Sequence, residues 1–198
     1  MGTGKNGTFD KNPEWQQWAI LSTQNCSIES INNENRINIL YGKSIERWLK
    51  FFKTEHITIL LSAIEGHGKW DNQTPFENNN KPQNYVGPIA VLTRATIRLS
   101  KLNAFWKNVP AVSKDIMNAE GFITSIGIGE IPFIKQATFS IWESEESMKN
   151  FAYKMKNHRD VIQKTRKENW YAEEMFTRFI PIKTFGKIAD KNAFDRML

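Results

Sequence analysis

His158 is the residue with the clearest chemical potential in this sequence, and no histidine follows His67 except this one. Neutral imidazole is the most common metal-binding side chain, and it can serve as the axial ligand of a heme iron. His158 stands in the polar run Lys154-Met-Lys-Asn-His-Arg-Asp160. A histidine in such a run is often a solvated helix residue. The residues alone therefore leave two interpretations open, a metal ligand and an exposed side chain.

Other catalytic and metal-binding motifs are absent from the sequence. The single cysteine, Cys26, excludes an internal disulfide and a cysteine-cluster metal site. There is no Gly-x-Ser-x-Gly, Gly-x-x-x-x-Gly-Lys or His-Glu-x-x-His motif. The segment Gly127-Ile-Gly129 lacks the third glycine of a dinucleotide-binding fingerprint, so we interpret it as the end of a strand.

The net charge of +6 does not define a partner by itself, because lysines and arginines are interleaved with acids along the chain. No nucleic-acid-binding signature accompanies the charge, so we expect no nucleic-acid partner. A basic surface suits an acidic protein or a peripheral contact with a membrane. The chain has no run of about 18 apolar residues and no secretory signal, which predicts a cytoplasmic protein.

The C-terminal half has the element order of a ferredoxin-like unit. Alternation predicts strands at 87–98, 121–129, 134–142 and 174–185. Helices are predicted from Ser100, with an interruption or kink at Pro110, and over 143–167 in two pieces. The order strand, helix, strand, strand, helix, strand predicts an antiparallel sheet with helices on one face.

The N-terminal block reads as a partial copy of the same unit. The strand at 17–22 corresponds to 137–142, and the strand at 56–63 corresponds to the last strand. This copy lacks its opening strand and helix. We therefore predict an α+β fold of two ferredoxin-like repeats, at 1–70 and 87–190, with a polar linker at 71–86 and a tail at 191–198. Two antiparallel sheets with helices outside would form an α+β barrel that holds a flat hydrophobic ligand.

Two strands of the C-terminal unit place polar side chains on the predicted barrel interior. We expect Arg94 on the first strand and Gln136 with Trp142 on the third strand to share that face. The alternative is an ordinary sheet with one solvated face. The guanidinium of Arg94 stays charged and offers five donors, so it could bind a carboxylate of a ligand.

Several specific blocks of the sequence closely resemble the spheroidene monooxygenase family. They cover nearly the whole chain and include Gly87-Pro-Ile-Ala-Val-Leu-Thr-Arg-Ala-Thr-Ile-Arg98, Gly127-Ile-Gly-Glu-Ile-Pro132, Gln136-Ala-Thr-Phe-Ser-Ile-Trp142, Phe151-Ala152-Tyr153 and His158. The resemblance implies an enzyme with heme b that uses dioxygen and reduced ferredoxin. Its expected action is to introduce keto groups into acyclic carotenoids by repeated hydroxylation. Family members have additional sequence before the point that matches Met1.

The chain also resembles, more distantly, bacterial heme-degrading monooxygenases of the dimeric α+β barrel type. This likeness implies that His158 is the axial ligand and that Phe151 lies in the heme pocket. Arg94 is then expected to be a distal or propionate-binding group, with Gln136 and Thr93 as lesser candidates and Trp142 as a pocket wall. A heme-degrading or peroxidase-like enzyme and a non-catalytic heme-binding module remain alternatives. A homo-oligomer could cover the edge left by the missing strand.

Overall fold

The computed structural model describes residues 2–4, 10–23, 31, 36–76, 82 and 84–187. The predicted tail at 191–198 and Cys26 lie outside these residues. The elements follow one another in the order β1 (Gly2–Gly4), β2 (Pro13–Trp18), α1 (Arg36–Tyr41), α2 (Lys43–Phe51), β3 (His56–Gly68), β4 (Ile89–Ile97), the 3-10 turn η3 (Leu99–Lys101), α3 (Leu102–Met117), β5 (Phe122–Ile131), β6 (Lys135–Trp142), α4 (Glu145–Lys154), α5 (Lys156–Glu168) and β7 (Tyr171–Lys187).

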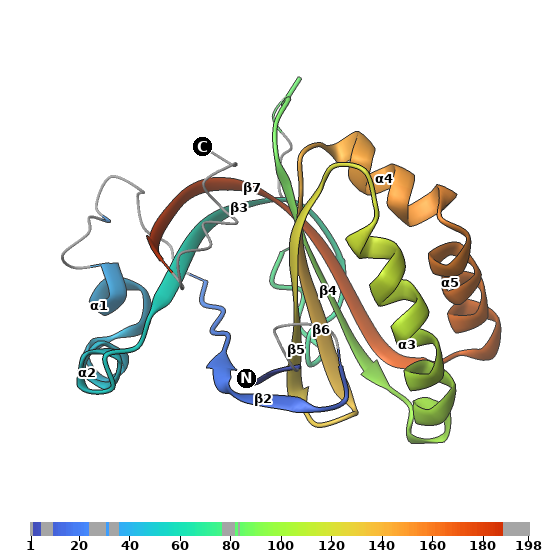
Figure 1. Cartoon of the computed structure of the whole chain (residues 1–198), viewed down its shortest axis with the longest axis horizontal. Helices are drawn as coiled ribbons and strands as arrows, with labels where there is room; N and C mark the ends of the chain where they lie inside the picture. Colours follow the sequence, from blue (N-terminus) through green and yellow to red (C-terminus); the bar gives the residue numbers. More distant parts are fainter. Residues whose placement is uncertain are drawn as a thin grey trace. The chain divides into compact units, whose positions relative to one another are not determined.

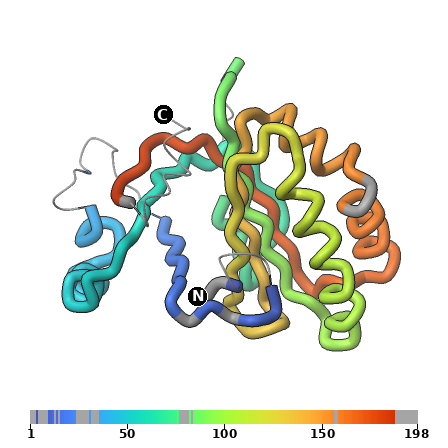
Figure 2. The backbone as a smooth tube through the Cα atoms, viewed as in Figure 1, coloured from blue at the N-terminus to red at the C-terminus, as the bar shows by residue number. Residues whose placement is uncertain are grey.

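The strands β4 to β7 form the predicted ferredoxin-like unit. Within the described seven-stranded sheet, they lie in the order β5-β6-β4-β7, and the pairs β4·β6, β4·β7 and β5·β6 are antiparallel. The tube in Figure 2 follows the chain from β4 through α3 into the hairpin of β5 and β6. The α+β class and the predicted order of elements are confirmed.

The helices α3, α4 and α5 cover one face of these strands (Figure 1). The helix α3 continues through Pro110, so of the two predicted alternatives, an interruption or a kink, the interruption is wrong. The second helical region is divided into two helices, as predicted, because Met155 adopts an extended conformation with φ −71° and ψ 121°. The side chain of Ser144 caps α4 by accepting a hydrogen bond from the backbone N–H of Ser147 at 3.1 Å. The break at Met155 fixes where α5 begins.

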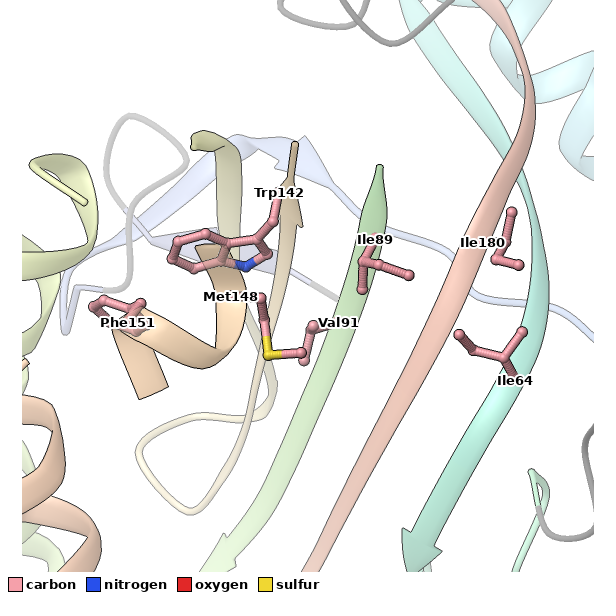
Figure 3. Packing of buried hydrophobic residues seen from close by; sticks show 7 residues of the cluster. All are labelled: Ile64, Ile89, Val91, Trp142, Met148, Phe151 and Ile180. Atoms are coloured by element: carbon pink, nitrogen blue, oxygen red, sulfur yellow. The ribbon is translucent and has the colours of Figure 1, made fainter. Parts of the chain in front are cut away.

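Two apolar clusters attach the helices to the sheet. The first joins Trp142 of β6 and Val91 of β4 to Met148 and Phe151 of α4, as Figure 3 shows. The second joins Ile97 of β4 to aromatic residues at the beginning of α3 and before β7. Burial of these large side chains supplies the main stabilisation of the helix layer, because apolar area is removed from water.

In the described residues, the N-terminal elements follow the order strand, strand, helix, helix, strand, and the repeat that lacks its opening strand and helix stays a prediction. The position of one strand differs from the prediction, because β2 covers Pro13–Trp18 and the predicted strand covered 17–22. We predicted two facing sheets. In the described residues, β2 and β1 instead extend one edge of a single sheet beside β5, and β3 forms the opposite edge beside β7.

The described residues divide into two compact units whose boundaries differ from those of the predicted repeats. One unit contains the described residues of 1–19 and 61–182, and the other those of 20–60 and 183–187. The second unit has its own small core, in which Leu40 of α1 packs with Ile31 and Phe185. Of the helices in the described ranges, none is both long and apolar enough to span a bilayer.

Candidate functional site

His158 lies in the first turn of α5 and forms the end of a row of three aromatic rings. The centroids of Trp142 and Phe151 are 5.1 Å apart, and those of Phe151 and His158 are 4.5 Å apart. We call Trp142, Phe151 and His158 the aromatic stack. The sequence predicted all three as cofactor-binding residues, and the structure brings them together. The break at Met155 allows this arrangement, because it turns the start of α5 back toward α4.

The hydrogen bonding of His158 fixes the state of its ring. Its Nδ1 lies 3.1 Å from the carbonyl oxygen of Ala152. Because a carbonyl can only accept, this contact assigns the proton of the neutral ring to Nδ1 and leaves the lone pair on Nε2. Burial lowers the pKa of His158 below its usual value of 6.5, although the Ala152 carbonyl and the charge of Asp115 act in the opposite direction. His158 is therefore a neutral imidazole at pH 7, the form that binds metals.

Trp142 and Phe151 support the His158 ring from the protein interior. Trp142 is 1% exposed, and its indole N–H donates a hydrogen bond to Ser140 Oγ at 3.0 Å. Phe151 is 7% exposed and packs between Trp142 and His158. Both rings lie in the core, so they orient His158 more than they offer surface to a ligand.

One residue near the middle of β4 is exposed although it lies on the helix-covered face of the sheet. Thr93 is exposed there, although Val91 and Ala95 on the same face are buried. Thr93 pairs with Thr138 of β6, which is half-buried. Thr93 lies between β6 and β7 in the sheet, on the same sheet face as Trp142.

Gln136 also lies on the helix-covered face, because it pairs with Ala95 of β4. Its side-chain amide donates to the carbonyl oxygen of Ile131 at 3.2 Å. Arg94 pairs with Ala137 and therefore points to the opposite face. The prediction that Arg94 and Gln136 line one interior is wrong. The error lies in β6, whose polar positions face the helices while its apolar positions Ala137 and Ile141 are buried on the other face.

Arg94 is the centre of a charged group that we call the Arg94 cluster, formed with Asp71, Glu130 and Glu173. The Arg94 side chain is 0% exposed. Its guanidinium lies 2.9 Å from carboxylate oxygens of Asp71 and Glu130, and it also forms an ion pair with Glu173. Three carboxylates therefore use the donors that a heme propionate or a distal ligand would need.

The Arg94 cluster anchors the turn after β3. The backbone N–H groups of Asp71 and Asn72 donate to the two carboxylate oxygens of Glu173 at 2.9 and 2.8 Å. These two residues have positive φ angles of 49° and 65°, which directs adjacent N–H groups toward one anion. The ring of Trp70 lies 5.3 Å from the guanidinium carbon of Arg94. These contacts give the cluster a structural role.

Two carboxylates of this cluster, those of Asp71 and Glu173, are held in their charged form. The pKa of Asp71 is lowered by hydrogen bonds from Lys135 and Arg94. Burial raises the pKa of Glu173, but the N–H groups of Asn72 and Asp71 and the charge of Arg94 outweigh it, so the net shift is downward. Asp71 and Glu173 are therefore both ionised at neutral pH.

Two cavities can be described by their lining residues. One of ≈ 460 Å³ runs along α3 beside Trp106, Val109 and Pro110. The other, of ≈ 470 Å³, adjoins the Arg94 cluster beside Asp71 and Glu173. Neither is lined by a residue of the aromatic stack. Within the described residues, no group of three or more His, Cys, Asp and Glu side chains could hold a metal ion together.

Sequence reasoning missed two features of this site. The hydrogen-bond partner of His158 is the backbone carbonyl of Ala152, and no side-chain pattern reveals a backbone partner. The exposure of Thr93 depends on where α3, α4 and α5 leave the sheet uncovered. A threonine in the middle of the otherwise apolar run of β4 was the only available signal.

The fold and the site define an α+β protein with a ferredoxin-like unit and a neutral histidine held over one sheet face. Sequence comparison with known proteins assigns the chain to a family within that class. The chain is 32% identical to the spheroidene monooxygenase of Rhodobacter capsulatus, over 96% of this chain and 77% of that protein. It is 38% identical to the spheroidene monooxygenase of Cereibacter sphaeroides, over 97% of this chain. The chain belongs to the spheroidene monooxygenase family.

The chain spans 57% of the length of the Cereibacter sphaeroides protein. No protein-family model matches it. Among solved structures, a putative monooxygenase from Fusobacterium nucleatum is 15% identical, with a TM-score of 0.47 over 77% of this chain and 65% of that one. That likeness is too low to carry an argument about function.

Proposed function

We propose that this chain forms part of a heme-dependent monooxygenase that introduces hydroxyl and keto groups into acyclic carotenoids. Membership of the spheroidene monooxygenase family supports the reaction class. The observation that carries the cofactor assignment is the hydrogen bond from His158 Nδ1 to Ala152, which leaves Nε2 with a lone pair. Reduced ferredoxin is the proposed electron donor.

The residues present fit a heme iron ligand in their chemistry. His158 is neutral, its tautomer is fixed, and its ring is held by Phe151. A heme bound there would supply oxygen activation, which no side chain of the site can provide. For each hydroxylation, one oxygen atom enters a C–H bond, and two electrons and two protons reduce the other to water. Arg94 has no part in this proposal, because its donors bind carboxylates.

The helix-covered face would receive the substrate. Thr93, which is exposed, and Thr138, which is half-buried, offer hydroxyl groups on this face, and Gln136 lies on the same face. A polyene has no polar group in its middle, so these side chains would act on its end or on the oxygen that is added. The buried rings of Trp142 and Phe151 would keep water from the side of the His158 ring that they cover.

The absorption spectrum of the heme complex tests the cofactor assignment. We expect heme titrated into the purified chain to give a Soret band, and His158→Ala to shift it and weaken binding at least about tenfold. The matched control is His67→Ala, because His67 stacks on Phe176 instead of Phe151. Equal spectra and affinities for wild type and His158→Ala would remove His158 from the ligand role.

Products from cells that make acyclic carotenoids test the reaction. We expect expression of the chain to yield hydroxylated and keto carotenoids, and His158→Ala to abolish them. Release of iron and a bilin from bound heme under reductant would instead identify a heme-degrading enzyme. Heme binding without either product would identify a non-catalytic heme-binding module.

A further inference from the structure

The helix α2 presents three aromatic side chains to solvent. Trp48 is 44% exposed, Phe51 is 80% exposed and Phe52, just after the helix, is 59% exposed. The rings contact one another, with centroids 5.1 Å apart for Trp48 and Phe52 and 4.9 Å apart for Phe51 and Phe52. We call these three residues the aromatic patch. Exposed apolar residues are ordinary when single, but a contiguous group indicates a binding surface.

The spacing of the aromatic patch places it on one side of α2. Positions 48, 51 and 52 are related as i, i+3 and i+4, so their side chains project from the same helix face. The neighbouring apolar positions Ile45 and Leu49 are half-buried, and no residue of α2 is fully buried. Only part of the apolar surface of α2, around Ile45 and Leu49, therefore packs against the protein, and the rest is exposed to solvent.

The other side of the same segment is basic. Lys43, Arg47, Lys50 and Lys53 are all exposed, and Glu46 is the one acid in residues 43–53. Four positive charges against one negative charge give this segment a net charge of +3. Glu46 is already bound to Lys50 at 2.7 Å, so it does little to repel an anionic surface. The charge favours a partner that carries many negative groups.

We propose that α2 and Phe52 form a docking site for a lipid bilayer with anionic headgroups. Aromatic side chains on one face and lysine and arginine on the other are the features of helices that lie in the plane of a membrane interface. The aromatic patch would enter the boundary between headgroups and acyl chains, while Lys43, Arg47 and Lys53 would contact phosphates. An anionic bilayer satisfies both the apolar and the charged side of this surface.

This inference does not depend on heme or on the proposed reaction, because every residue that carries it lies in the second compact unit. For a family that acts on hydrophobic substrates, such a docking site would affect how the substrate reaches the protein. A protein held at the bilayer could take its substrate from the membrane rather than from water. The docking site would then serve delivery, not chemistry.

Vesicle sedimentation with the full chain tests the docking site. We expect the wild type to bind vesicles made of equal parts phosphatidylcholine and phosphatidylglycerol, and to bind pure phosphatidylcholine much more weakly. Trp48→Ser, Phe51→Ser and Phe52→Ser combined should lower the partition coefficient at least about tenfold. Lys43→Gln, Arg47→Gln and Lys53→Gln combined should lower it by about fivefold for each charge.

The control for the aromatic variant is Tyr153→Ser, because Tyr153 is a similarly exposed aromatic residue at 64% on α4. It should bind vesicles like the wild type. The proposal would be overturned if the wild type did not bind anionic vesicles. It would also be overturned if both combined variants bound them as strongly as the wild type. A dimer in solution that the aromatic variant converts to a monomer without any change in vesicle binding would overturn it too, since the patch would then be a protein interface.

Discussion

The two faces of the ferredoxin-like sheet carry two very different polar sites. On one face, Arg94 is fully buried and surrounded by three carboxylates. On the other, His158 has one hydrogen bond on one nitrogen and aromatic packing on its ring. The first site satisfies its charged groups within the protein. The second keeps one basic nitrogen available for a ligand.

This difference follows from the free energy of burying each group. A charged guanidinium loses a large hydration free energy when it is buried, so it persists there only with opposite charges beside it. A neutral imidazole loses much less and can remain partly buried with one partner. A buried arginine in a candidate site is therefore weak evidence for ligand binding, while a neutral histidine with a fixed tautomer is stronger evidence.

The largest expected effect is that of removing Arg94. In Arg94→Met, Glu130 and Glu173 would lose their shared counterion while 14% and 16% exposed. We expect the free energy of unfolding to fall by about 3 to 5 kcal/mol. Urea unfolding followed by circular dichroism measures it. The control, Arg98→Met, changes an exposed arginine just after the same strand and should have little effect.

The Arg94→Met variant also tests whether the two sheet faces have the different roles described above. If Arg94 has the structural role described above, heme affinity per folded molecule should stay unchanged in Arg94→Met. If Arg94→Met instead kept the stability of the wild type and did not bind heme, the structural role of Arg94 would be wrong. Arg94 would then be a ligand-binding residue, as the sequence alone predicted.

The sequence predicted the order of elements well, because hydrophobic alternation and glycine positions mark strands and turns locally. It also predicted that the helix carrying His158 is divided. The sequence did not predict correctly which side chains of β6 face the helices. Residues 136–141 alternate polar and apolar side chains, and we assigned the apolar set to the helices. The pairing with β4 puts the polar set there instead, since both sheet faces are covered and alternation cannot distinguish them.

Acid should weaken the face that holds Arg94. The pKa values of Asp71 and Glu173 are lowered by folding, so their stabilisation is complete above the ordinary carboxyl pKa and is lost as pH falls through the lowered values. We expect the free energy of unfolding to decrease between about pH 5 and pH 3. Glu173→Gln should show a shallower decrease, measured by urea unfolding at each pH. A decrease as steep as that of the wild type would show that other carboxylates cause it.

The smallest expected effect concerns the ring that holds His158. Phe151→Leu keeps an apolar side chain, so we expect a loss of only about 1 kcal/mol in stability. The His158 ring would gain water, and because burial is the main cause of its lowered pKa, that pKa should rise toward its usual value. Proton NMR of the imidazole across a pH titration measures it. Phe105→Leu is the control, since Phe105 belongs to the other apolar cluster, with Ile97 and Trp170. An unchanged His158 pKa in Phe151→Leu would mean that the stack does not set the protonation state of the proposed ligand.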